Sequence, residues 1–137
     1  MHATVTFRSR MPLSGINDKG NETLFDTSPE FSGTGSAASP MDTVLEALGA
    51  CSMMDVLSIL KKMKREPVLL ETRLDAERAD DHPKVFTSIQ VIYRLESPSC
   101  RQEELEKAVR LSMDKYCSVA AMLRASGCAI NWSAELV

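Results

Sequence analysis

The pattern of apolar and polar positions predicts one long helix over residues 39–63. No proline interrupts this stretch until Pro67. Ser39 is a suitable N-cap, Pro40 fits the first helical position, and Asp42 follows Ser39 at the spacing of a capping box. The apolar positions recur at steps of three and four residues: Val44, Leu45, Leu48, Cys51, Met54 or Asp55, Leu57, Ile59 and Leu60. We therefore expect a central helix with a thiol near its middle.

Strands are predicted on both sides of this helix, because several segments alternate apolar and polar residues. The first two are expected to form a hairpin, with Gly15 and residues 17–20 as turn residues. The third and fourth are expected to form a second antiparallel hairpin. The five segments are residues 2–8, 22–25, 68–77, 85–95 and 128–137.

Two further helices are predicted between the fourth and the last strand. Residues 102–115 have helical apolar spacing with a charged outer side, and a short helix begins near Ser118 and is ended by Gly127. Hairpins and helices are thus segregated along the chain. This order predicts an α+β fold with antiparallel sheet, in a single domain over residues 1–137.

Composition and charge narrow the possible functions. Apolar residues make up 44% and charged residues 26% of the chain, with a formal net charge of −3. Basic residues are scattered, so no surface for a nucleic-acid backbone is expected. The first ten residues contain no continuous apolar segment, and the helix at 39–63 carries three acidic residues. We expect a cytoplasmic, soluble protein with no membrane partner.

The four cysteines are the candidate chemistry of this chain. They are Cys51, Cys100, Cys117 and Cys128, and no two form a CxxC pair. With only two histidines, we expect no metal, no cofactor and no histidine-based nucleophile scheme. In a reducing compartment the thiols are expected to be free, and any disulfide to be transient.

Two of these thiols have small neighbours that leave space beside the sulfur. They are Cys51, which follows Gly49 and Ala50, and Cys117, which precedes Ser118. If a helix begins at Ser118, its N-terminus lowers the pKa of Cys117, which is then the nucleophile that the residues favour. Cys51 in mid-helix needs a cation instead, and Arg8 or Arg10 after the first strand are the available ones.

At these two cysteines the chain resembles a known family. The segments SPMDTVLEALGACSMMDVLSILKKM and DKYCSVAAML, in this order and at this separation, resemble the OsmC/Ohr family of osmotically inducible and organic hydroperoxide resistance proteins. The resemblance extends over nearly the whole chain. It implies an intertwined homodimer whose antiparallel sheets wrap two central helices, with both cysteines close together at the interface.

The resemblance also implies a thiol peroxidase cycle. Cys51 would attack a hydroperoxide and become a sulfenic acid, and Cys117 would resolve it to a disulfide. A dithiol reductant, small or lipoyl-type, would then restore both thiols. Peroxidase members hold the thiolate with an N-terminal arginine, which here would be Arg8 or Arg10, and with a glutamate. Met41 stands at the position of that glutamate, and the adjacent Asp42 is the possible acidic partner.

Ser118 replaces a proline that often follows the second cysteine, so the chain resembles a less characterised OsmC-like subgroup. The leading hypothesis is an antioxidant peroxidase for apolar organic hydroperoxides in stress defence, with Met41 and Met54 as substrate contacts. The alternative is a non-catalytic dimer that binds a hydrophobic small molecule in the interface pocket. A thiol acyl-transfer enzyme is disfavoured because no histidine is placed to act as a base.

Overall fold

The computed structural model describes residues 1–137, and internal contacts divide the chain into two compact units, residues 1–44 and 45–137. Each unit has its own three-stranded sheet. The assignment of residues 1–137 to a single domain stays a prediction.

The first unit contains an antiparallel sheet in the order β1-β2-β3, where a two-stranded hairpin was expected. The strand that was not expected is β2. Gly15 lies within it, so the expectation that Gly15 is a turn residue is wrong. A Cβ at Gly15 would lie 3.0 Å from the Phe25 ring, so the glycine makes room for an aromatic side chain on the paired strand. The strands are β1 (Ala3–Thr6), β2 (Leu13–Asn17) and β3 (Glu22–Phe25), and a 3₁₀ turn, η1 (Pro29–Phe31), follows.

Asp26 organises the connection that follows β3. It is only 2% exposed. Its Oδ1 accepts hydrogen bonds from the Thr27 and Thr34 amides at 2.7 and 3.1 Å, and its Oδ2 accepts from the Ser36 amide at 3.0 Å. The Thr34 and Ser36 hydroxyls donate to Oδ2 at 2.6 and 2.5 Å. These bonds, the one from the Ser36 hydroxyl above all, hold the pKa of Asp26 well below its ordinary value.

The predicted central helix is confirmed as α1 (Pro40–Lys62). Its capping box is present: Ser39 Oγ accepts the Asp42 amide at 3.2 Å, and Asp42 Oδ2 accepts the Ser39 amide at 3.0 Å. By length and composition α1 is also apolar enough to cross a membrane. Of its apolar side chains, Leu48, Val56 and Leu60 are fully buried, whereas Met54 and Leu57 are 71% and 38% exposed.

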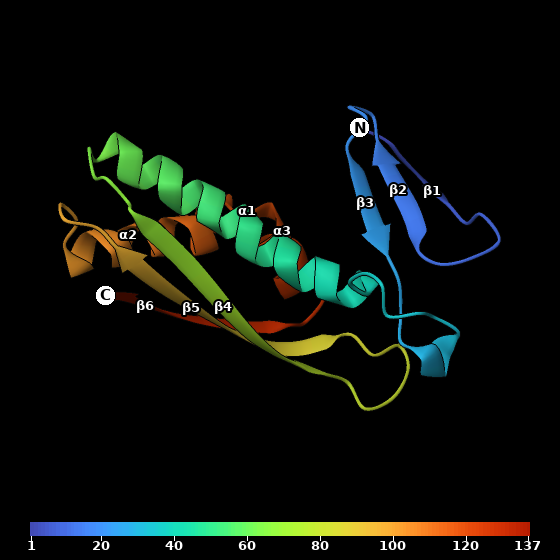
Figure 1. Cartoon of the computed structure of the whole chain (residues 1–137). Coiled ribbons are helices and arrows are strands. Elements are labelled where there is room, and N and C mark those ends of the chain that lie inside the picture. The colour runs from blue at the N-terminus through green and yellow to red at the C-terminus, as the bar shows by residue number, and fades with distance from the viewer. The chain divides into compact units, whose positions relative to one another are not determined.

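The second unit packs helices on one sheet (Figure 1). The strands β4 (Leu69–Arg78) and β5 (Phe86–Glu96) form the predicted antiparallel hairpin. The closing strand β6 (Ala129–Leu136) pairs parallel to β5, not antiparallel as expected. A parallel pair needs a long crossover. It is supplied by α2 (Gln102–Leu111), the π-helical turn η2 (Ser112–Tyr116) and α3 (Ser118–Ala125).

The two faces of this sheet differ in polarity because alternate residues of each strand point to opposite sides. On the apolar face, Ile89, Val91, Tyr93 and Leu95 of β5 are at most 1% exposed. Helix α1 packs closely there, since a Cβ at Gly49 would lie 3.0 Å from Leu74 Cδ1. On the other face, charged residues pair across strands, as in the bond of Arg94 Nε to Glu135 Oε1 at 2.8 Å. The core therefore lies between the sheet and its helices.

Replacement of Asp26 by asparagine is expected to loosen the connection that it holds. The Thr34 and Ser36 amides should exchange with solvent roughly tenfold faster, since a carboxylate acceptor is lost. In the unmodified protein, the lowered pKa of Asp26 means that its stabilising effect is complete above the unfolded value of about 3.9. The effect declines as the pH falls from there through the lowered pKa.

Hydrogen exchange followed by NMR measures both effects, with Asp18→Asn at an exposed turn as the control. If the two amides were as well protected in Asp26→Asn as in the unmodified protein, this account of the connection would be contradicted.

Candidate functional site

Cys51 and Cys117 meet in the second unit. Cys51 lies near the middle of α1, and Cys117 is the residue between η2 and α3. The Cys51 thiol lies close enough to Cys117 to contribute to the raised pKa of Cys117. Cys117 is 3% exposed, whereas Cys51 is half-buried. The chain thus brings together the two predicted thiols, and Cys51 is the one that solvent reaches more readily.

Cys117 is the N-cap of α3, as the sequence predicted, and its sulfur accepts the Ala120 amide at 3.4 Å. The expected lowering of its pKa is wrong. Burial raises the pKa of Cys117 to about 11, and the neighbouring Cys51 thiol adds to the rise. The helix amides at Ala120 and Val119 oppose this rise without reversing it. Cys117 is therefore a protonated thiol near neutral pH.

Two buried serines join the segments that carry these cysteines. Ser52 follows Cys51 on α1, and Ser112 opens the turn η2 that leads to Cys117. The Ser112 hydroxyl lies within hydrogen-bond distance of two acceptors, the Ser52 carbonyl oxygen at 3.2 Å and Asp55 Oδ2 at 3.0 Å. The Ser112 carbonyl accepts the Cys117 amide at 2.8 Å. Ser112 therefore bonds to both cysteine-bearing segments.

Tyr93 of β5 anchors the same cluster to the sheet. Its hydroxyl donates to Ser52 Oγ at 2.7 Å and lies 3.4 Å from Met113 Sδ. Burial raises the pKa of Tyr93 to about 12. The charge of Cys117 adds to this rise and that of Arg124 opposes it, so both groups lie near the hydroxyl. Tyr93 is thus a neutral hydrogen-bond donor beside the thiol pair.

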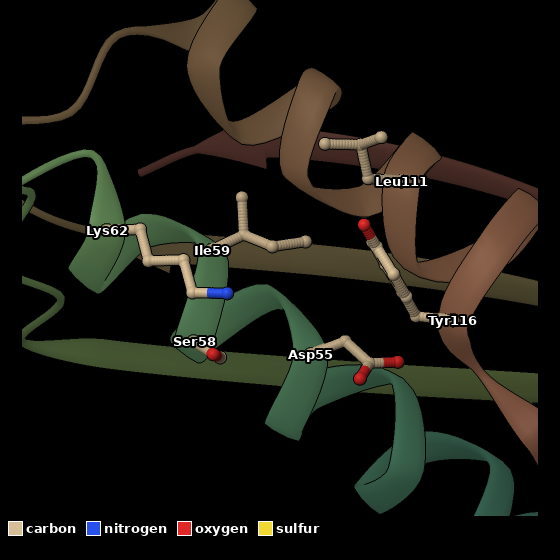
Figure 2. Close-up of a pocket in the computed structure, with 6 residues that line it drawn as sticks. All are labelled: Asp55, Ser58, Ile59, Lys62, Leu111 and Tyr116. Atoms are coloured by element: carbon tan, nitrogen blue, oxygen red, sulfur yellow. The ribbon is translucent and has the colours of Figure 1, made fainter.

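A pocket of about 270 Å³ begins one helical turn from Cys51 (Figure 2). Its polar lining consists of a carboxylate, an ammonium group and two hydroxyls, and two aliphatic side chains complete the wall. The lining residues are Asp55, Ser58, Ile59, Lys62, Leu111 and Tyr116. Tyr116 precedes Cys117 directly, so the pocket lies beside the segments of both cysteines.

The remaining predicted site residues have the following places. Arg8 and Arg10 are exposed in the connection between β1 and β2, and neither forms an ion pair. Met41 is half-buried in the first turn of α1, and Asp42 serves in the capping box. Met54, on the turn of α1 after Cys51, is 71% exposed. Their roles at the thiols stay predictions.

The other two cysteines are separate from this pair. Cys100 precedes α2 and Cys128 precedes β6, and both are buried free thiols. Burial raises the pKa of each. A thiol must be deprotonated to attack, so neither environment favours reactivity. No group of three or more potential metal ligands occurs in the chain.

Sequence reasoning missed the residues that bring the thiols together. Ser52, Ser112 and Tyr93 are ordinary core positions in the hydrophobic pattern, and only their burial marks them. Lys62 could have been found from the sequence. It follows Asp55 by seven residues, and this spacing places both residues on the face of α1 that carries Cys51.

The comparisons with known proteins identify relatives of this chain. The family model described as OsmC-like protein matches residues 33–133. Protein YhfA of Escherichia coli K12 is 37% identical over 123 residues, covering 90% of this chain and 89% of YhfA.

Solved structures show the same fold. An OsmC-like protein of Mycoplasma pneumoniae has a TM-score of 0.82 at 16% identity, covering 99% of this chain and 96% of that one. An organic hydroperoxide resistance protein OsmC of Legionella pneumophila has a TM-score of 0.68 at 15% identity, covering 98% and 95%. These structures define an α+β class with the architecture described above. The chain belongs to the OsmC-like family.

The pKa of Cys117 yields a direct prediction. In a variant whose other three cysteines are replaced by alanine, the Cys117 thiolate should form well above the ordinary thiol pKa of about 8.5, because burial alone opposes its charge. Ultraviolet absorbance of the thiolate against pH measures this. A midpoint at or below the ordinary value would contradict the assignment of Cys117 as a protonated thiol.

Proposed function

We propose that this protein is a thiol-dependent peroxidase that reduces organic hydroperoxides. The observation that supports this most is the direct interaction of Cys51 with Cys117, two thiols far apart in the sequence and adjacent in space. Two adjacent thiols are what a cycle of sulfenic acid and disulfide requires. Some relatives of the same fold carry the name organic hydroperoxide resistance protein, which agrees with this chemistry.

The environments of the two thiols support a division of roles. Cys51, the more accessible, attacks the O–O bond, so that one oxygen stays on its sulfur as a sulfenic acid and the other leaves as an alcohol. Cys117 keeps its proton until the second step, since burial raises its pKa to about 11. Its sulfur then displaces water from the sulfenic acid, and a disulfide forms. A thiol reductant restores both thiols.

A cation beside Cys51 would raise its thiolate fraction. Arg8 or Arg10 in this role, with Asp42 as the acidic partner, is part of the proposal. Contacts of Met41 and Met54 with an apolar substrate are also part of the proposal. We further propose that the protein acts in the cytoplasm, where reductants keep thiols free.

Replacement of Cys51 by serine should abolish consumption of cumene hydroperoxide, with a fall of about 100-fold or more, because the attacking sulfur is gone. Cys117→Ser should still react once and then accumulate a sulfenic acid that dimedone traps. The measurements are peroxide consumption, free-thiol titration and mass spectrometry.

Cys100→Ser and Cys128→Ser are the matched controls, since both thiols are buried and unpaired. Equal consumption by Cys51→Ser would refute the peroxidase. It would leave the alternative that the pocket of a non-catalytic dimer binds a hydrophobic small molecule.

We also propose that the protein is a homodimer that pairs through α1. Met54 and Leu57 are 71% and 38% exposed on this helix, and exposed apolar groups on one helix are suited to contact a second copy.

Met54→Glu should shift the protein toward the monomer, since a charge cannot be buried unpaired at low cost. Sedimentation equilibrium measures this, with Val85→Glu in an exposed turn as the control. A monomer at all concentrations before substitution would contradict the dimer.

A further inference from the structure

One stripe of α1 carries both the attacking thiol and a charged pocket. Cys51, Asp55, Ile59 and Lys62 follow one another at helical spacing, and the last three line the pocket described above. Tyr116, the residue before Cys117, forms part of the opposite wall. The pocket therefore begins one helical turn after Cys51 and includes the residue that precedes Cys117.

The pocket presents opposite charges that are not paired with each other. The ammonium group of Lys62 forms no ion pair or hydrogen bond within the chain, and it extends along α1 toward the same space as Asp55 (Figure 2). Asp55 accepts the Ser112 hydroxyl with Oδ2, and its Oδ1 has no donor. Hydroxyls of Ser58 and Tyr116 complete the polar lining. A ligand that carries a cation and an anion matches this arrangement.

We propose that this pocket binds an amino-acid thiol, a small molecule with an α-ammonium group, a carboxylate and a thiol, and that this thiol reduces the Cys51–Cys117 disulfide. The inference rests on the proposed peroxidase cycle and names the class of its reductant. Lys62 binds the carboxylate and Asp55 binds the ammonium group. The pocket volume of about 270 Å³ suits a ligand of this size and falls just below the usual range of drug-sized sites.

Reduction of the Cys51–Cys117 disulfide consumes two molecules of the amino-acid thiol. The thiolate of the first attacks Cys51 Sγ, a mixed disulfide forms, and Cys117 leaves and takes up a proton. The thiolate of the second attacks the sulfur of the bound molecule, a small-molecule disulfide is released, and Cys51 is restored. A purely apolar reductant would leave both pocket charges without a partner.

Four small thiols that differ in charge test this inference. The Cys51–Cys117 disulfide is formed with one equivalent of cumene hydroperoxide and reduced by L-cysteine, cysteamine, 3-mercaptopropionate or 2-mercaptoethanol. The rate constants are corrected for the thiolate fraction of each thiol. L-Cysteine should react fastest, and L-serine, which has a hydroxyl in place of the thiol, should slow it competitively.

Lys62→Gln should lower the ratio of the L-cysteine rate to the 2-mercaptoethanol rate by about twofold to fivefold, the effect of one exposed charge pair. Lys61→Gln, which alters the neighbouring lysine outside the pocket, should leave this ratio unchanged. Equal corrected rates for all four thiols, or an unchanged ratio in Lys62→Gln, would overturn the inference.

The two proposals fail in different ways. If the hydroperoxide forms no disulfide, the peroxidase is refuted. The disulfide can then be made with diamide, and the same four thiols still test the pocket.

Discussion

Hydrogen bonds of Ser112 join the two segments that carry Cys51 and Cys117. Its hydroxyl bonds toward the Ser52 carbonyl on α1, and its carbonyl accepts the Cys117 amide. Tyr93 extends this cluster to the sheet through Ser52 Oγ. Because an unpaired buried polar group costs about 1–3 kcal/mol, each member of the cluster opposes movement of the others. The core of the second unit thereby sets the geometry on which thiol chemistry depends.

Burial gives the two thiols different properties. Cys117 is enclosed between η2 and α3, and the loss of hydration outweighs the favourable amides of the helix N-terminus, so its pKa rises to about 11. Cys51 lies on the same side of α1 as the pocket and remains partly open. A protonated, enclosed thiol next to an accessible one suits a resolving and an attacking cysteine. Asp55 and Lys62 give the adjacent pocket one charge of each sign.

Much of the fold could be predicted from periodicity and capping. The bounds of α1 and its Ser39–Asp42 capping box, the β4–β5 hairpin and the start of α3 at Ser118 all follow local patterns. Strand β2 was missed because Gly15 is usual in turns, and only its packing under Phe25 explains it in a strand. The parallel pairing of β6 depends on the path of the crossover, which local sequence does not encode. The thiol pair followed from the family resemblance, whereas the raised pKa of Cys117 needed the burial that only the fold supplies.

The central claim is that Cys51 and Cys117 form one redox unit. Peptide mapping by mass spectrometry of the unmodified protein, after one equivalent of cumene hydroperoxide, tests this most directly. The account predicts a single disulfide that links the peptides of Cys51 and Cys117, with Cys100 and Cys128 still free. A disulfide that involves either of those cysteines, or a stable sulfinic acid at Cys51 with Cys117 unreacted, would contradict it.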